Sequence, residues 1–186
     1  VTNQQFQRYR GGHGSGTTFR GKSLAGDTCP VVQVSYQDAV EFASWINAII
    51  KASGVLPADH GFRLPTAGEW LIIAQCGDKR IYPWGSGRPA VYGNYEGSDS
   101  YPVTCPVEAS GSNEWGLFGV GGNVWELTEE RLGSLRVVRG ASWACGNPMS
   151  LRCDNRDYAV AANHKGNDIG FRLVLAPVRT GMQGVR

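Results

Sequence analysis

The sequence lacks several features that mark common classes of protein. It has no apolar run of the roughly 18 residues that a bilayer-spanning helix needs. Its charges form no block of one sign, and its formal net charge is only +2. Nucleic acid and anionic membranes are therefore not the expected partners. No N-terminal targeting segment is visible, and the composition leaves the cellular compartment open.

Motifs and metal-ligand patterns are equally scarce. The five cysteines are an odd number without a CxxC pair, which argues against a zinc ribbon and a disulfide-dense scaffold. The three histidines, His13, His60 and His164, are far apart and show no HxxxH spacing that would favour an iron site. The GxSxG, phosphate-loop and HExxH motifs are also absent, so none of the sites that they mark is indicated.

The chain does contain enough apolar and aromatic residues for one packed domain. Its 186 residues include six Trp and 26 Gly, and the glycines are scattered as expected for many turns. Helices are predicted over about residues 2–10, after Ser35 and after Thr66, where a Ser or Thr cap precedes Gln, Asp or Glu by three positions. From Arg80 onward the pattern changes to short apolar runs between turns. Helices followed by strands predict an α+β domain.

Seven phrases occur in a fixed order along the chain. They are VTNQQFQRY, PVVQVSYQDAVEFASWI, FRLPTAGEW, YPWG, GLFGVGGNVWELTE, RVVRGASW and GFRLV. Together they resemble the formylglycine-generating-enzyme (sulfatase-modifying factor) domain, a variant of the C-type lectin fold. The resemblance covers residues 1–175, without the strand that usually precedes the first phrase, and leaves 176–186 as a tail. It implies two helices packed on small, twisted antiparallel sheets with much irregular loop.

The resemblance bears directly on Cys145. Enzymes of this family hold Cu(I) between two cysteines five residues apart, since two soft thiolates suit this ion. The first place corresponds to Cys145, but the second falls on Ser150, and Cys153 resembles a different cysteine of the family. No copper and no catalytic residue are therefore expected. The alternative is a copper-dependent oxidase of thiol substrates with Cys145 at its centre, and a Cys145–Cys153 disulfide stays open.

A structural calcium site is the second feature that the resemblance implies. In the family, the GGNVWE loop binds Ca²⁺ through backbone carbonyls and one Glu, which correspond here to Gly122, Val124 and Glu126. Gly119 stands where the family usually has an Asn ligand, so one of the six to eight oxygens that Ca²⁺ prefers is missing. The alternative is that this loop only caps turns and packs in the core.

One branch of the family does no catalysis: the variable proteins of diversity-generating retroelements. Their segment between the Gly-Ser-Trp and GFRL phrases is hypermutated at adenines and binds ligands on one face. Residues 143–172 have this layout, and many of them are types that an AAC codon reaches by changing adenines only. The predicted ligand-binding residues are Ala144, Cys145, Gly146, Asn147, Pro148, Asp157, Tyr158, Ala159, Val160, Ala161, Ala162, Asn163 and His164.

Exposed loops rich in small residues, Asn and Tyr are typical of adaptable binding surfaces. The expected function is therefore non-catalytic recognition of a protein or other macromolecule on a cell or phage target. The favoured location is a cell surface or a phage particle. Besides the oxidase, two alternatives stay open: an invariant structural or interaction module, and a buried strand within residues 157–162.

Overall fold

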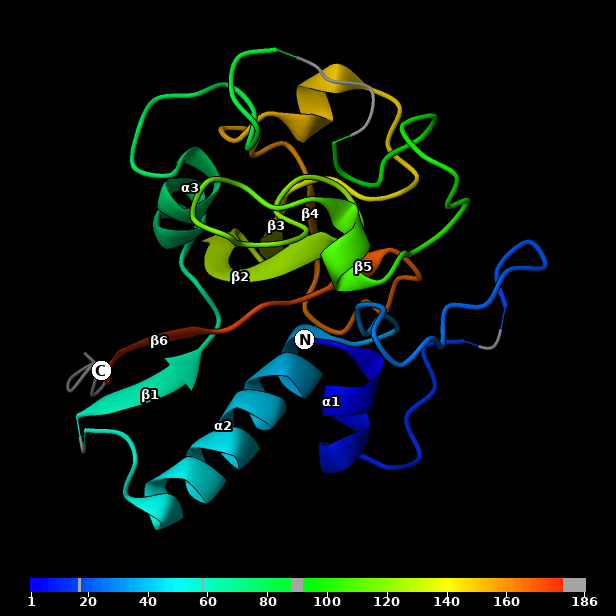
Figure 1. The fold of residues 1–186 in the computed structure, drawn as a ribbon. Coiled ribbons are helices and arrows are strands. Elements are labelled where there is room, and N and C mark those ends of the chain that lie inside the picture. Colours follow the sequence, from blue (N-terminus) through cyan, green and yellow to red (C-terminus); the bar gives the residue numbers. More distant parts are fainter. Residues whose placement is uncertain (17, 58, 88–91, 179–186) are drawn as a thin grey trace.

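Each helix that the capping pattern predicts is present in the computed structural model, which describes residues 1–16, 18–57, 59–87 and 92–178 (Figure 1). The helices are α1 (Asn3–Tyr9), α2 (Tyr36–Ser53) and α3 (Ala67–Gln75), with short 3-10 turns η1 (Val107–Ser110) and η2 (Pro148–Leu151). The strands are β1 (His60–Arg63), β2 (Trp125–Leu132), β3 (Leu135–Arg139), β4 (Ala159–Ala161), β5 (Ile169–Gly170) and β6 (Val174–Pro177). Within these ranges, the helices are too short or too polar to cross a bilayer.

Capping boxes define the starts of all three helices. The side chains of Thr2, Ser35 and Thr66 each accept a hydrogen bond from the backbone N–H three residues on, and the side chain at that position accepts one in return. These bonds satisfy amides that the first turn of a helix leaves unpaired. α2 ends where Gly54 adopts a left-handed φ of 67°, which glycine tolerates because it has no Cβ.

The strands form two small sheets. β1 pairs with β6 in antiparallel fashion, and a four-stranded sheet has the order β4-β3-β2-β5. β2 and β3 are antiparallel with a bulge between Leu127 and Arg131, whereas β5 pairs with β2 in parallel. The α+β class and the small sheets are confirmed; the family resemblance implied two helices and antiparallel sheets only, whereas the structure has the three helices that capping predicts and one parallel pair. Part of the expected tail forms β6, while residues 179–186 lie outside the described residues.

The helices divide between two parts of the molecule. α2 lies below the β1–β6 sheet with α1 on its other side, while α3 lies beside the four-stranded sheet (Figure 1). The Phe6 ring stacks on Phe42 at 5.4 Å between centroids, and Phe171 meets both rings edge-on. Burial of each Phe contributes roughly 1.5–3 kcal/mol before the entropy cost of ordering. The chain that follows β5 is therefore held firmly against the N-terminal helices.

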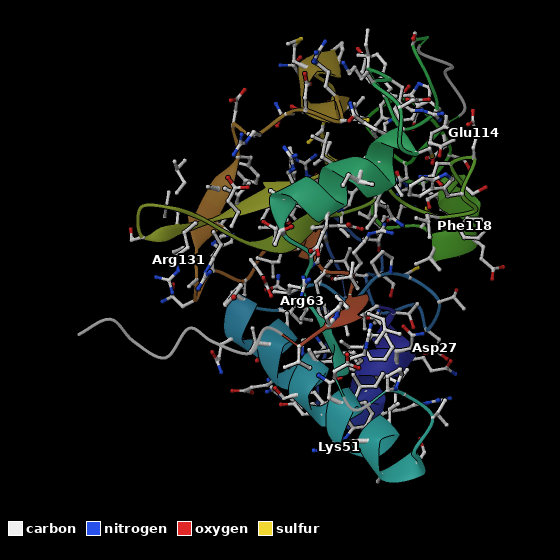
Figure 2. The ribbon with its side chains drawn as sticks, turned by 90° about the vertical axis from the view of Figure 1, so that its left-hand side faces the viewer. Asp27, Lys51, Arg63, Glu114, Phe118 and Arg131 are labelled. Atoms are coloured by element: carbon white, nitrogen blue, oxygen red, sulfur yellow. The ribbon has the colours of Figure 1, made fainter. Side chains whose placement is uncertain are left out.

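A bidentate ion pair connects β1 with the first turn of α3. Arg63 donates to both carboxylate oxygens of Glu69 at 2.6 and 2.7 Å, and Glu69 also accepts from the backbone N–H of Thr66. Figure 2 shows Arg63 between α2 and the part of the molecule that contains α3. The Arg63 guanidinium lowers the pKa of Glu69 to about 2.

We expect Glu69→Gln to flatten the acid limb of the stability profile. A carboxylate with a lowered folded-state pKa contributes stability that is present above its ordinary pKa of 4.5 and is lost as the pH falls to about 2. Urea unfolding across this window should show a smaller change in unfolding free energy for the variant. Glu114→Gln is the control because that side chain is 74% exposed. Equal slopes for all three proteins would contradict the assignment.

Candidate ligand-binding surface

The chain from Trp143 to Gly170 alternates between buried anchors and exposed stretches. The buried anchors include Trp143, Leu151, Cys153, Val160 and Ile169. The exposed residues between them include Ala144, Gly146, Asn147, Met149, Asp154, Arg156, Asp157, Tyr158 and residues 161–165. Each exposed stretch is held at both ends by side chains in the core, so it is displayed on a fixed backbone.

Two of these stretches and one strand meet in a shallow pocket of about 270 Å³. Its lining residues are Trp125, Asn147, Met149, Ser150, Asn155, Asp157 and Tyr158. The Tyr158 ring lies on Trp125 with centroids 4.9 Å apart, and burial raises the pKa of the Tyr158 hydroxyl. The structure therefore brings three predicted residues, Asn147, Asp157 and Tyr158, to one aromatic and polar pocket.

Cys145 is half-buried at the edge of the main hydrophobic core. Its sulfur lies 3.5 Å from the Ser142 hydroxyl, which donates to the Asp168 carboxylate at 3.2 Å. Burial raises the pKa of Asp168. The Cys145 thiol, the Ser142 hydroxyl and the Asp168 carboxyl thus lie in one row of polar contacts. In the part of the chain that the structure describes, however, no three His, Cys, Asp or Glu side chains gather as a metal site.

All five cysteines are free thiols, so Cys145 and Cys153 form no disulfide. Cys153 is 1% exposed and belongs to a core cluster with Trp70, Ala74 and Val120. Burial raises the pKa of its thiol to about 12, so little reactive thiolate forms at neutral pH. Cys153 therefore has a packing role and does not replace the missing partner of Cys145.

The stretch that includes residues 159–161 differs from the loop that the sequence favoured. These residues form β4, which pairs with Leu135 to Val137 of β3 at the edge of the sheet. Val160 points into the core with 7% exposure, so its prediction as a ligand-binding residue is wrong. A strand of three residues is too short to show a clear alternation of apolar and polar residues in the sequence. The alternative prediction of a buried strand within residues 157–162 agrees with β4.

The turn after β4 carries the last predicted residues, Ala161, Ala162, Asn163 and His164, which are all exposed. Lys165 ties this turn to the start of α2 through an ion pair with Asp38 at 2.8 Å. The backbone N–H of Tyr36 also donates to the Ala162 carbonyl. None of the turn residues lines the pocket of Asn147 and Tyr158, so these two groups of exposed predicted residues are separate.

Glu126, the predicted carboxylate ligand of calcium, is surrounded by protein donors. Its oxygens accept hydrogen bonds from Trp70 Nε1 at 2.6 Å and from Arg172 Nε and Nη2 at 2.6 and 2.7 Å. Burial disfavours the charge of Arg172, but the Glu126 carboxylate raises its pKa above the ordinary value. A guanidinium thus brings the positive charge that a bound cation would bring.

The two predicted carbonyl ligands lie in the same loop. At Gly122, where φ is 88°, a Cβ would lie 2.3 Å from the Asn94 carbonyl oxygen, so glycine is required there for packing. Val124 is buried in a second hydrophobic cluster. Because its carboxylate oxygens accept from Trp70 and Arg172, Glu126 does not fit the role of a calcium ligand. The alternative of a packing role for this loop agrees with the contacts.

Three residues of the surface region were missed from the sequence: Trp125, Ser142 and Asp168. Trp125 and Ser142 lie in the NVWE and GASW phrases, whose resemblance points to a calcium or packing loop and to the cysteine that follows. Asp168 has no local signal, because its bond with Ser142 joins positions 26 residues apart.

A small α+β domain with two short sheets and long irregular loops has the architecture of the C-type-lectin-like proteins. The chain belongs to the sulfatase-modifying factor enzyme 1-like domain family, whose sequence profile it matches over residues 1–177.

The relatives differ in what their names say of activity. The chain is 34% identical over 189 residues to a formylglycine-generating enzyme of Thermomonospora curvata, covering 80% of this chain and 56% of that protein. It is also 34% identical over 129 residues to inactive C-alpha-formylglycine-generating enzyme 2 of Bos taurus, covering 61% of this chain and 38% of that protein. The chain thus spans about half the length, or less, of these curated relatives.

The fold also matches a solved structure, Treponema denticola variable protein 1. The TM-score is 0.76 at 24% identity, and the match covers 96% of this chain and 82% of that one. This likeness establishes the shared fold.

We expect Glu126→Gln to lower the unfolding free energy by about 3 kcal/mol or more, because it leaves the Arg172 guanidinium buried without its counter-charge. Glu126→Gln combined with Arg172→Gln should recover part of the loss. Glu130→Gln is the control. It removes the more exposed pair with Arg156, where the effect should stay below about 1 kcal/mol. Urea unfolding measures all three, and a Glu126→Gln effect as small as that of the control would refute the assignment.

Proposed function

We propose that the chain recognises a macromolecular ligand, without catalysis, through the exposed residues of its C-terminal segment. The observation that carries this proposal is the alternation within residues 143–170, where buried anchors hold short exposed stretches. Side chains in such stretches can change while the anchors keep the backbone in place, since surface substitutions away from special features cost little stability.

The chemistry of the surface supports recognition of a protein or another macromolecule. Tyr158 presents a 38% exposed ring that is steadied by Trp125. Asp157 and Asn147 add hydrogen-bonding groups around the same pocket. Rigid aromatic side chains surrounded by small and polar ones give large contact area with adaptable hydrogen bonds. A target on a cell or phage, met at a cell surface or phage particle, agrees with this chemistry.

The relatives support the non-catalytic part of the proposal. The family contains a protein whose name describes it as inactive, and the fold is shared with one named a variable protein. We infer that this chain displays a variable surface over residues 143–172 in the manner of diversity-generating retroelement proteins. Ser150, at the place of the second copper ligand, agrees with the loss of the family's copper chemistry.

A copper-dependent thiol oxidase is the second candidate. The observation in its favour is the half-buried Cys145 thiol beside the Ser142 hydroxyl, since this thiol remains accessible while Cys153 does not. Several relatives are named as enzymes. The two candidates differ in what they require of the chain: the oxidase needs a soft metal site at Cys145, and recognition does not.

Titration with Cu(I) against a chromophoric chelator separates the candidates. On the recognition proposal, the unaltered protein binds Cu(I) no more tightly than Cys145→Ser does. Ser150→Cys, which restores the second thiol, should gain one tight site because two thiolates suit Cu(I). Ser134→Cys, which adds a thiol at an exposed turn, is the matched control. Stoichiometric Cu(I) binding that Cys145→Ser abolishes, together with an oxygen-consuming activity, favours the oxidase.

Sequencing of the surrounding locus tests the variable surface. We expect a near-copy of the coding segment for residues 143–172 that differs only at adenines and lies beside a reverse transcriptase gene. Sister copies should differ at Cys145 and Tyr158 and agree at Trp143 and Ile169, since the latter two are buried. A locus that has neither the near-copy nor the reverse transcriptase gene would contradict this part of the proposal.

A further inference from the structure

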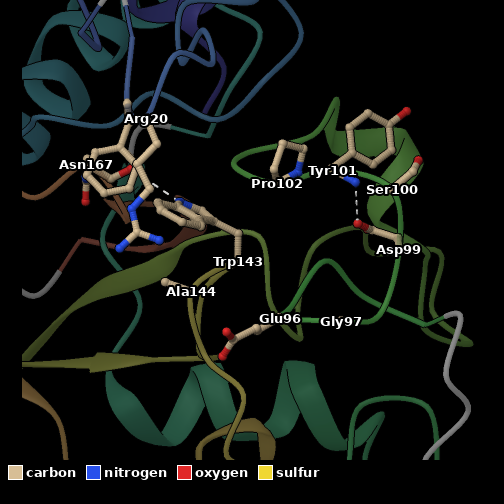
Figure 3. Close-up of a pocket in the computed structure, with 11 residues that line it drawn as sticks. Arg20, Glu96, Gly97, Asp99, Ser100, Tyr101, Pro102, Trp143, Ala144 and Asn167 are labelled. Atoms are coloured by element: carbon tan, nitrogen blue, oxygen red, sulfur yellow. Dashed lines mark hydrogen bonds between the residues drawn. The ribbon is translucent and has the colours of Figure 1, made fainter.

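A second and larger pocket, of about 440 Å³, extends from Ala144 away from the residues considered so far. Four parts of the chain line it: a turn with Phe19 and Arg20, the loop 96–102, Trp143 with Ala144, and Asn167. Figure 3 shows Arg20 and Asn167 on one side and Asp99 to Pro102 on the other, with Trp143 and Ala144 between them. Its volume suits a small molecule.

One wall is basic and aromatic. Phe19 and Lys22 exchange two backbone hydrogen bonds, and the residues between them, Arg20 and Gly21, have φ values of 50° and 77°. Positive φ at both central positions is characteristic of a type I′ turn, which holds Arg20 at its tip. The Phe19 ring lies 5.3 Å from the Arg20 guanidinium and 5.3 Å from the Trp143 ring. A cation and two aromatic rings therefore form one side of the pocket.

The opposite wall is acidic. The Asp99 carboxylate accepts a hydrogen bond from the backbone N–H of Tyr101 at 2.7 Å. Burial raises the pKa of the Asp99 carboxyl. Glu96 adds a second carboxylate from the same loop. Arg20, Glu96 and Asp99 line the pocket as exposed residues and take part in none of the ion pairs formed within the described residues.

The Glu96 carboxylate lies close to the backbone of Gly146. A Cβ at Gly146 would be 2.6 Å from Glu96 Oε2, closer than real Cβ contacts. The backbone also links the two segments, since the Glu96 N–H donates to the Cys145 carbonyl at 3.3 Å. A larger residue at position 146 would shift the end of the exposed Glu96 side chain away from this position.

We propose that this pocket binds a small zwitterion with an apolar or aromatic side chain, such as a free α-amino acid. Arg20 pairs with the carboxylate of the ligand, while Glu96 pairs with the ammonium group on the same carbon atom. Phe19, Tyr101 and Trp143 contact its side chain. Charge-assisted hydrogen bonds to both charged groups of the ligand use the opposite charges of Arg20 and Glu96. The inference does not depend on the identity of the proposed macromolecular ligand, although Trp143, Ala144 and Asn167 of the proposed surface segment also line this pocket.

Calorimetric titration with L-phenylalanine tests the proposal, with phenethylamine and 3-phenylpropionate as probes that each lack one charge. We expect each analogue to bind about tenfold more weakly than L-phenylalanine, because one charge-assisted contact is lost. Arg20→Asn, which the left-handed turn tolerates, should make L-phenylalanine and phenethylamine bind equally. Gly146→Ala should weaken both by displacing Glu96. Lys22→Gln, on the same turn but outside the pocket, should change nothing.

Circular dichroism confirms that each variant is folded before its titration is interpreted. The proposal is overturned if L-phenylalanine does not bind at millimolar concentration, if all three probes bind equally, or if Arg20→Asn keeps the preference for the carboxylate. Loss of binding in Lys22→Gln would also overturn it, because the effect would then belong to the turn as a whole and not to the Arg20 charge.

Discussion

The buried carboxylate of Glu126 is the constraint on which the rest of the structure depends. It joins α3 through Trp70, the four-stranded sheet through its own strand, and the chain after β5 through Arg172. Arg139 closes the cluster from another side, with its guanidinium 5.4 Å from the Trp70 ring. A buried charge is costly without its partner, so these distant segments must come together in one arrangement.

This cluster also explains how one segment can be both firmly held and largely exposed. Trp143 donates its backbone N–H to the Asn123 carbonyl at 3.0 Å, and Arg172 pairs with Glu126, so both ends of residues 143–172 are attached to the same loop and strand. Between those ends, anchors such as Leu151 and Val160 occupy the core. Stability therefore resides in the attachments and anchors, and ligand choice on the proposed surface resides in the exposed positions between them.

Local rules predicted the local features well. The capping boxes at Thr2, Ser35 and Thr66 give the helix starts because they involve only neighbouring backbone amides. The same reasoning failed where a contact spans the chain. The role of Glu126 as the partner of Arg172 joins positions 46 residues apart. The residues of the loop around Glu126 do not show that Arg172, from a distant part of the chain, supplies the positive charge beside it.

By itself, the sequence determined the α+β class, the three helices and the family to which the chain belongs, because capping, turn residues and ordered phrases are all local. It also gave residues 143–172 as the segment predicted to bind ligands. Only the tertiary structure decided which of its residues face solvent, since β4 buries Val160 while Tyr158 stays partly exposed on Trp125. It also brought Arg20 opposite Glu96 and Asp99. Burial and the placement of opposite charges depend on which distant segments contact one another. The order of residues within one segment does not determine these contacts.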